Sequence, residues 1–334
     1  MVRGLLALVF CMAALCLTGC MRDDQSVPRP VMVPPFDGAA AYQECSAFVN
    51  LGPKPAGSPM AWRAAVYLRD RLAAIGVDAR LDSFADAVPG GTGIFHNVMG
   101  RIPGDTNHIV IIAAHFDTKT GISEDFVGAN DSGSGVGVVL GLMKALAGDL
   151  TGTGISAGLS RAETRGRRQA TLHRERSSGR PEIWAVFFDG EECRKEYGAI
   201  DGLHGSRHLA RQLVANGEAS RVKAFILLDM VGDRDLTVTI PRNGSPALMA
   251  AVFDAARVEG VRERFFLCHG GILDDHQPFL DAGITAVNII DFRYGSSPGG
   301  NEYWHTSADT LDKLDVSSLE VVGRVVLRVM AGIE

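Results

Sequence analysis

Four apolar runs of about six residues each constrain the fold of this chain more than any other feature. They cover residues 109–114, 183–188, 224–228 and 284–290. Continuous runs of this length are typical of strands that are covered on both faces, as in parallel sheets. Segments with apolar residues at helical spacing lie before, between and after the runs, at residues 39–50, 60–75, 135–146, 205–214, 247–258 and 316–330. The alternation predicts an α/β fold, a three-layer α/β/α sandwich around a mostly parallel mixed sheet.

The N-terminal residues have the pattern of a secretory leader. Arg3 precedes an apolar stretch, residues 4–17, that is too short for a stop-transfer helix, and Leu17-Thr18-Gly19-Cys20 then resembles a lipoprotein cleavage motif. We interpret residues 1–20 as a lipoprotein signal peptide with Cys20 lipidated; an ordinary signal peptide is the alternative. The polar, proline-rich residues 21–36 predict a linker, and residues 37–334 a single domain. We therefore expect an exported, bacterial-type lipoprotein of the cell envelope or periplasm, anchored to a membrane by its lipid.

The composition of the whole chain is that of an ordinary globular protein. A net charge of −6 and 46% hydrophobic residues give no basic bias, so no nucleic-acid partner is predicted. Beyond the leader, the cysteines are Cys45, Cys193 and Cys268, which do not indicate a disulfide framework. Residues 149–180 differ, with seven arginines against three acids and hardly any large apolar residue. We expect a surface insertion there, with a basic docking patch as a second interpretation.

Acidic residues and histidines follow the apolar runs, at the point where each strand should end. Ligand sites of open α/β sheets form outside the carboxyl ends of the strands. Any one such residue is more typical of a helix cap, a turn or a partly buried histidine. Together, so many carboxylates would repel one another unless they share protons or bind a cation, and two imidazoles among them favour zinc over calcium or magnesium. The residues concerned are His115, Asp131, Glu191, Glu192, Asp229, Asp274 and His305.

Motifs spread along the chain resemble the M28 family of zinc aminopeptidases, and within it the glutaminyl-peptide cyclotransferases most. The similarity runs in order from about residue 40 to the end of the sequence. It is carried by His115-Phe116-Asp117, Asn130-Asp131-Ser132-Gly133, Phe187-Phe188-Asp189-Gly190-Glu191-Glu192, Leu203-His204-Gly205-Ser206-Arg207-His208, Asp274-Asp275-His276-Gln277-Pro278-Phe279 and Trp304-His305-Thr306. The resemblance implies the zinc aminopeptidase fold and peptide substrates with a free N-terminus.

The resemblance also implies a set of metal ligands. Asp131, Glu192 and His305 would hold the principal zinc, with one position left for the substrate or water. His115 and Asp229 would hold a second zinc, with Asp131 bridging the two. The sequence retains both sets, so it leaves open whether each chain binds one Zn²⁺ or two.

The remaining roles differ between the two enzyme classes that the resemblance allows, cyclases and aminopeptidases. By similarity, Glu191 would be the general base, and in a cyclase Asp274 would be a relay acid supported by Asp229. Trp304 and Tyr197 match aromatics of the cyclase pocket, although core or rim packing without substrate contact would also explain them.

The predicted activity is conversion of an N-terminal glutamine to pyroglutamate with loss of ammonia. The alternative is an aminopeptidase, which removes N-terminal residues from peptides. A non-catalytic binding protein on the same fold is a third reading, which the presence of the base and ligands disfavours. The stretch 291–303 is rich in Gly and Ser, and Phe292 and Tyr294 are candidates for the pocket wall there.

Overall fold

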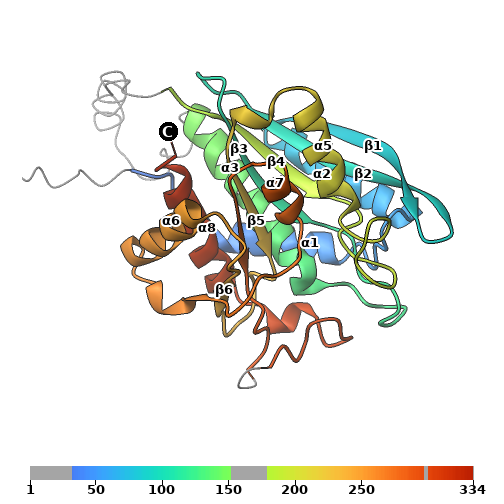
Figure 1. Ribbon diagram of the computed structural model, residues 1–334. Helices are drawn as coiled ribbons and strands as arrows, with labels where there is room; N and C mark the ends of the chain where they lie inside the picture. The colour runs from blue at the N-terminus through green and yellow to red at the C-terminus, as the bar shows by residue number, and fades with distance from the viewer. Residues whose placement is uncertain (1–31, 152–178, 297–299, 334) are drawn as a thin grey trace, which may run out of the picture. The chain divides into compact units, whose positions relative to one another are not determined.

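A mixed sheet of six strands lies at the centre of the residues that the computed structural model describes, 32–151, 179–296 and 300–333 (Figure 1). Its order is β1-β2-β4-β3-β5-β8, in which β4, β3, β5 and β8 are parallel neighbours. An antiparallel hairpin of β1 and β2 joins this parallel part through β4. The bounds are β1 (Asp78–Val88), β2 (Gly91–Ile102), β3 (Ile109–His115), β4 (Glu182–Phe188), β5 (Val222–Asp229) and β8 (Ala286–Ile290). The four apolar runs coincide with the parallel strands, and the predicted α/β fold is confirmed.

Helices cover both faces of the sheet (Figure 1). In β3, Val110 and Ile112 contribute to the core on one face, and Ile109 and Ile111 to the core on the other. This burial on two sides explains why the parallel strands are continuously apolar. The first face carries α1 (Gly38–Val49), α2 (Pro59–Ala74), α3 (Gly135–Thr151), α6 (Pro246–Val258) and α8 (Val316–Met330), and the second α5 (His204–Ala215) and α7 (Gln277–Asp281).

Several smaller elements were not predicted from the sequence, nor was the β1–β2 hairpin. Residues of β1 mostly alternate between partly buried and exposed positions, so the strand lacks a continuous apolar run. Two further strands that were not predicted have three residues each, too few to show a period. The smaller elements are β6 (Val238–Ile240) and β7 (Phe265–Leu267), which pair in parallel, the kinked turn η1 (Ala129–Ser134), and the 3-10 turns η2 (Ala219–Arg221), η3 (Arg262–Arg264) and η4 (Leu311–Lys313).

Helix α1 packs very closely on α3 at Gly137. A Cβ atom built on Gly137 would lie 2.5 Å from the carbonyl oxygen of Ala41 and 2.7 Å from the Cβ of Cys45. The position therefore requires glycine because of the close approach of the two helices. Since α3 directly follows η1, the packing of α1 on α3 also helps to hold η1 in place.

Several predictions fall outside the described residues. They are the signal peptide with Cys20, most of the linker, and residues 152–178 of the arginine-rich insertion. In the part of the chain that the structure describes, no helix has the length and apolar character needed to cross a membrane. Because Cys20 lies outside the described residues, the predicted lipid anchor stays a prediction.

Candidate metal centre

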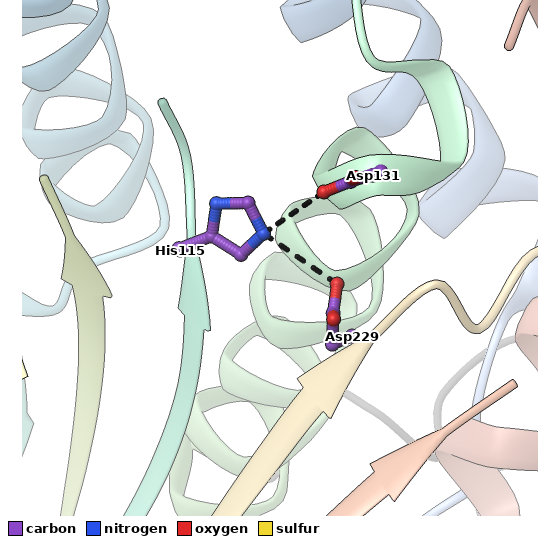
Figure 2. Close-up of side chains that lie close together, drawn as sticks. All are labelled: His115, Asp131 and Asp229. Atoms are coloured by element: carbon purple, nitrogen blue, oxygen red, sulfur yellow. Dashed lines mark ion pairs between the residues drawn. The ribbon is translucent and has the colours of Figure 1, made fainter. Parts of the chain in front are cut away.

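His115 ends β3 and points toward two carboxylates (Figure 2). Its Nε2 lies 3.1 Å from Asp131 Oδ1 and 3.5 Å from Asp229 Oδ1. Asp229 ends the neighbouring parallel strand β5, and Asp131 lies in η1, between β3 and α3. All three side chains are buried, and each offers a ligand atom within 4.8 Å of the others. The parallel register of β3 and β5 thus brings together residues that are far apart in sequence.

A second group shares Asp131 and adds Glu192 and His305. His305 Nε2 lies 2.9 Å from Glu192 Oε1 and 3.3 Å from Asp131 Oδ2. Asp131 therefore faces His115 with one carboxylate oxygen and His305 with the other. His305 has a φ of 53°, a left-handed conformation that residues other than glycine adopt at an energetic cost and that concentrates at functional sites.

The electrostatics of both groups favour bound positive charge. Burial alone would lower the pKa of His115, but its contacts with Asp117, Asp131 and Asp229 raise that pKa well above the usual value. Burial also opposes the charge of His305, yet Asp131 and Glu192 raise its pKa to about 9. The carboxylates thus attract protons onto both imidazoles, and a metal cation at the same place would satisfy the same carboxylates.

The donor atoms fit zinc. Asp229 Oδ1 is buried and makes no good hydrogen bond within the described residues, since His115 Nε2 is 3.5 Å away. A buried carboxylate oxygen without a donor is unfavourable unless a cation is nearby. Imidazole nitrogens and carboxylate oxygens are ligands that zinc accepts. Three ligands from Asp131, Glu192 and His305 would leave one position of a tetrahedral ion for a substrate.

Glu191 and Glu192 are oriented by Asp117, which is fully buried beneath them. The backbone N–H groups of Glu191 and Glu192 donate to Asp117 Oδ1 and Oδ2, at 3.1 Å each. Gly190 precedes them with a φ of 79°, which allows the chain to turn sharply after β4. Burial raises the pKa of Glu191 well above its usual value, and Glu192 and Asp274 add to the effect, while His115 opposes it. A carboxylate whose pKa is raised in this way suits general base catalysis near neutral pH.

Asp274 is a second buried acid, and two hydrogen bonds hold its carboxylate. Its Oδ2 accepts a hydrogen bond from Asn288 Nδ2 on β8 at 2.6 Å, and its Oδ1 accepts one from the N–H of Asp275. Burial raises the pKa of Asp274 well above the usual value, with Asp229 and Asp275 adding to it. Neighbouring acids of this kind share protons. Asn288 was not singled out in the sequence, although a lone amide within an apolar strand could have drawn attention to it.

The predicted aromatic residues lie in different surroundings. Trp304 is exposed and stacks on the His305 ring, with ring centroids 4.1 Å apart, and Phe292 makes an edge contact with Trp304, with centroids 5.0 Å apart. The Tyr197 hydroxyl lies against Glu191. The prediction that Tyr294 is a pocket wall was wrong, because Tyr294 is fully buried and donates its hydroxyl to Asp309. A buried tyrosine hydroxyl needs a hydrogen-bond partner, and Asp309 supplies one.

Two further charged residues support the site and were not predicted. Lys119 Nζ lies 3.0 Å from Glu192 Oε2, on the side of that carboxylate away from His305. Asp309 accepts hydrogen bonds from the N–H groups of Asn130 and Asp131, at 2.7 and 3.1 Å. Lys119 lies four residues after His115, so its nearness in sequence could have drawn attention to it. No local pattern marks Asp309, whose partners are remote in sequence.

Comparison with known proteins identifies the family to which this site belongs. The model of "Peptidase family M28" matches residues 97–330. The chain belongs to peptidase family M28. A glutaminyl cyclase structure from an Acidobacteriales bacterium is 30% identical with a TM-score of 0.74, and the alignment covers 92% of this chain and 97% of that one. The glutaminyl-peptide cyclotransferase of Bos taurus is 26% identical over 297 residues, 80% of this chain and 75% of the relative.

These neighbours place the M28 protein in the glutaminyl cyclase branch of the family. A Zn-dependent exopeptidase from Parabacteroides distasonis has the same fold, with a TM-score of 0.72, 23% identity and coverage of 90% of this chain and 100% of that one. The M28 protein spans 65% to 75% of the length of seven curated relatives. The predicted family is therefore confirmed, whereas the roles of the individual site residues stay predictions.

Proposed function

We propose that this protein is a zinc-dependent glutaminyl-peptide cyclotransferase that converts an N-terminal glutamine of peptides to pyroglutamate and releases ammonia. The observation that carries the proposal is the presence of two buried acids, Glu191 and Asp274, of which the second raises the pKa of the first. Asn288 holds the Asp274 carboxylate in place through a hydrogen bond to its Oδ2. Similarity to glutaminyl cyclases over most of the chain supports the same activity.

The proposed reaction joins the substrate's own α-amine to the carbon of its γ-carboxamide and breaks the bond to the amide nitrogen. A zinc ion held by Asp131, Glu192 and His305 would polarise the γ-carbonyl. Glu191 would accept a proton from the attacking amine and deliver it to the departing nitrogen, which leaves as ammonia. Asp274 would assist by keeping the shared proton close to Glu191. Holding amine and amide together in one pocket makes the attack intramolecular, which favours ring closure.

A second candidate is an aminopeptidase, and one observation favours it. His115 and Asp229 form a further group of possible ligands around Asp131, as a site with two metal ions would require. In that reaction Glu191 would activate water for attack on the first peptide bond. The two activities would thus use the same base and differ in the attacking nucleophile.

Incubation of the zinc-loaded protein with peptides that begin with Gln, Leu or Ala distinguishes the candidates. We expect ammonia and a product 17 Da lighter from the Gln peptide, the mass of the ammonia lost, and no free amino acid from any peptide. Glu191→Gln is the matched control, since it keeps the size of the side chain and should retain zinc while losing turnover. Release of free Leu or Ala by the wild-type protein would replace the proposal with the aminopeptidase.

The place of action remains part of the proposal. The sequence pattern at Cys20 supports an exported lipoprotein that meets its peptides at the cell envelope. Peptides with a free N-terminus are the expected partners of such a site.

A further inference from the structure

Tyr197 makes a contact that its predicted role in lining the substrate pocket does not require. Its hydroxyl lies 2.9 Å from Oε1 and 3.1 Å from Oε2 of Glu191, so it faces both oxygens of the candidate base. Burial, together with the charges of Glu191, Glu192 and Asp274, raises the pKa of Tyr197 far above its usual value. The phenol therefore keeps its proton and acts as a hydrogen-bond donor to the carboxylate.

The ring of Tyr197 is confined from two further directions. A Cβ atom on Gly202 would lie 2.5 Å from Tyr197 Cδ1, so a residue without a side chain lies directly against the ring. The ammonium group of Lys119 lies over the ring, 5.6 Å from its centroid. The ring therefore has little freedom to turn its hydroxyl away from Glu191.

The loop that carries Tyr197 is itself tied down by its neighbours. The carboxylate of Asp201 accepts hydrogen bonds from the N–H groups of Arg194, Lys195 and Glu196, at 2.6, 2.9 and 3.2 Å. Arg207 on α5 donates to the carbonyl oxygens of Gly198, Gly202 and Leu203. These hydrogen bonds restrain the loop, and with it the position of the Tyr197 hydroxyl against Glu191.

We infer that Tyr197 is a positioning residue for Glu191, holding both oxygens of that carboxylate in the orientation needed for proton transfer. The inference rests on the proposed function, because it assumes that Glu191 is the base. Either candidate reaction needs the same orientation, so the inference holds for cyclization and for hydrolysis. Replacing the hydroxyl should therefore affect the chemical step more than substrate binding.

The test compares Tyr197→Phe with the wild-type protein in whichever of the two reactions the wild type catalyses. We expect kcat to fall about 10- to 100-fold, KM to change less than about threefold, and zinc content to stay the same, since removal of one hydrogen bond to a charged group has effects of this size. Tyr67→Phe, in which the altered ring lies on α2 and packs against Phe48, is the matched control and should retain wild-type kinetics.

A double-mutant cycle separates action through Glu191 from direct action on the substrate. In a Glu191→Asp background, where the carboxylate is shortened and withdrawn from the phenol, adding Tyr197→Phe should change kcat less than about twofold. An unchanged kcat in Tyr197→Phe, or a rise in KM alone, would overturn the inference and return Tyr197 to substrate binding. A wild-type protein that releases amino acids contradicts only the cyclase proposal, whereas one that turns over neither peptide overturns both.

Discussion

Lys54 is a buried ammonium group whose partners are backbone carbonyls. It is 1% exposed, donates to the oxygens of Gly52 and Val127 at 2.7 and 3.3 Å, and lies 4.8 Å from the centre of the Phe48 ring. Burial lowers its pKa to about 8, against an unfolded value near 10.5. The residue thus links the segment before α2 to the segment before η1, which carries Asp131.

The lowered pKa of Lys54 predicts a pH dependence of stability. Between pH 8 and 10.5 the unfolded chain binds more protons at this residue than the folded chain does, so stability rises with pH in that window. From pH 7 to pH 10, the free energy of unfolding of the wild type should rise by about 2 kcal/mol relative to Lys54→Met. Urea unfolding of both proteins across this range measures it. A difference between them that does not vary with pH would contradict the prediction.

At the scale of single residues, the sequence indicated which side chains gather at the site but not how they are held. His115, Glu192 and Asp229 could be located because each lies at or just beyond the end of an apolar run, and parallel strands end at the same edge. Asp309 could not, because it contacts η1 only through tertiary structure. The contact of Tyr197 with Glu191 depends on a loop conformation that no periodicity encodes.

Among the elements, α3 offers two glycines with opposite expected effects. A methyl group on Gly137 would collide with Ala41 and Cys45 of α1, whereas one on Gly148 of the same helix would meet no heavy atom of the described residues within 4 Å. Gly137→Ala should therefore destabilise the protein by about 1–3 kcal/mol, through overpacking. Gly148→Ala should be neutral or stabilise it by up to about 1 kcal/mol, through helix propensity. Thermal unfolding of the two variants measures both changes in stability. Equal changes would show that the close contact between α1 and α3 does not make Gly137 less tolerant of a methyl group than Gly148.

The predicted helices agree with the structure to within a few residues, because each carries apolar residues on the side that packs against the sheet. The prediction 316–330 matches α8 (Val316–Met330), and α1 and α2 begin one residue earlier than expected. The β1–β2 hairpin was not predicted, because it lies at the edge of the sheet and is stabilised by pairing between strands rather than by burial on two faces. Short α7 likewise depends on tertiary packing, through the buried ring of Phe279.

For the molecule as a whole, the candidate site lies at the carboxyl end of the parallel strands, and the break in the described chain between residues 151 and 179 lies at the other end. Helix α3 runs from η1 to Thr151, away from the site, and the chain next enters β4 at its amino end, Glu182. Residues 155–175 lie outside the described residues, and the sequence predicts a surface insertion there, so replacing them with a short Gly-Ser linker should leave kcat, KM and zinc content within about twofold of the wild type. Steady-state kinetics with metal analysis tests this, and a large loss of activity would show that the segment reaches the site.

The position of Asp131 between the two candidate ligand groups has a consequence for metal stoichiometry. Because one carboxylate faces both His115 and His305, the two places for a cation are not independent of each other. An ion bound at one place withdraws electron density from the shared carboxylate and repels a second ion, so the second would bind more weakly than the first. The number of ions per chain would then be set by the free metal concentration around the protein as much as by the ligands that its sequence encodes.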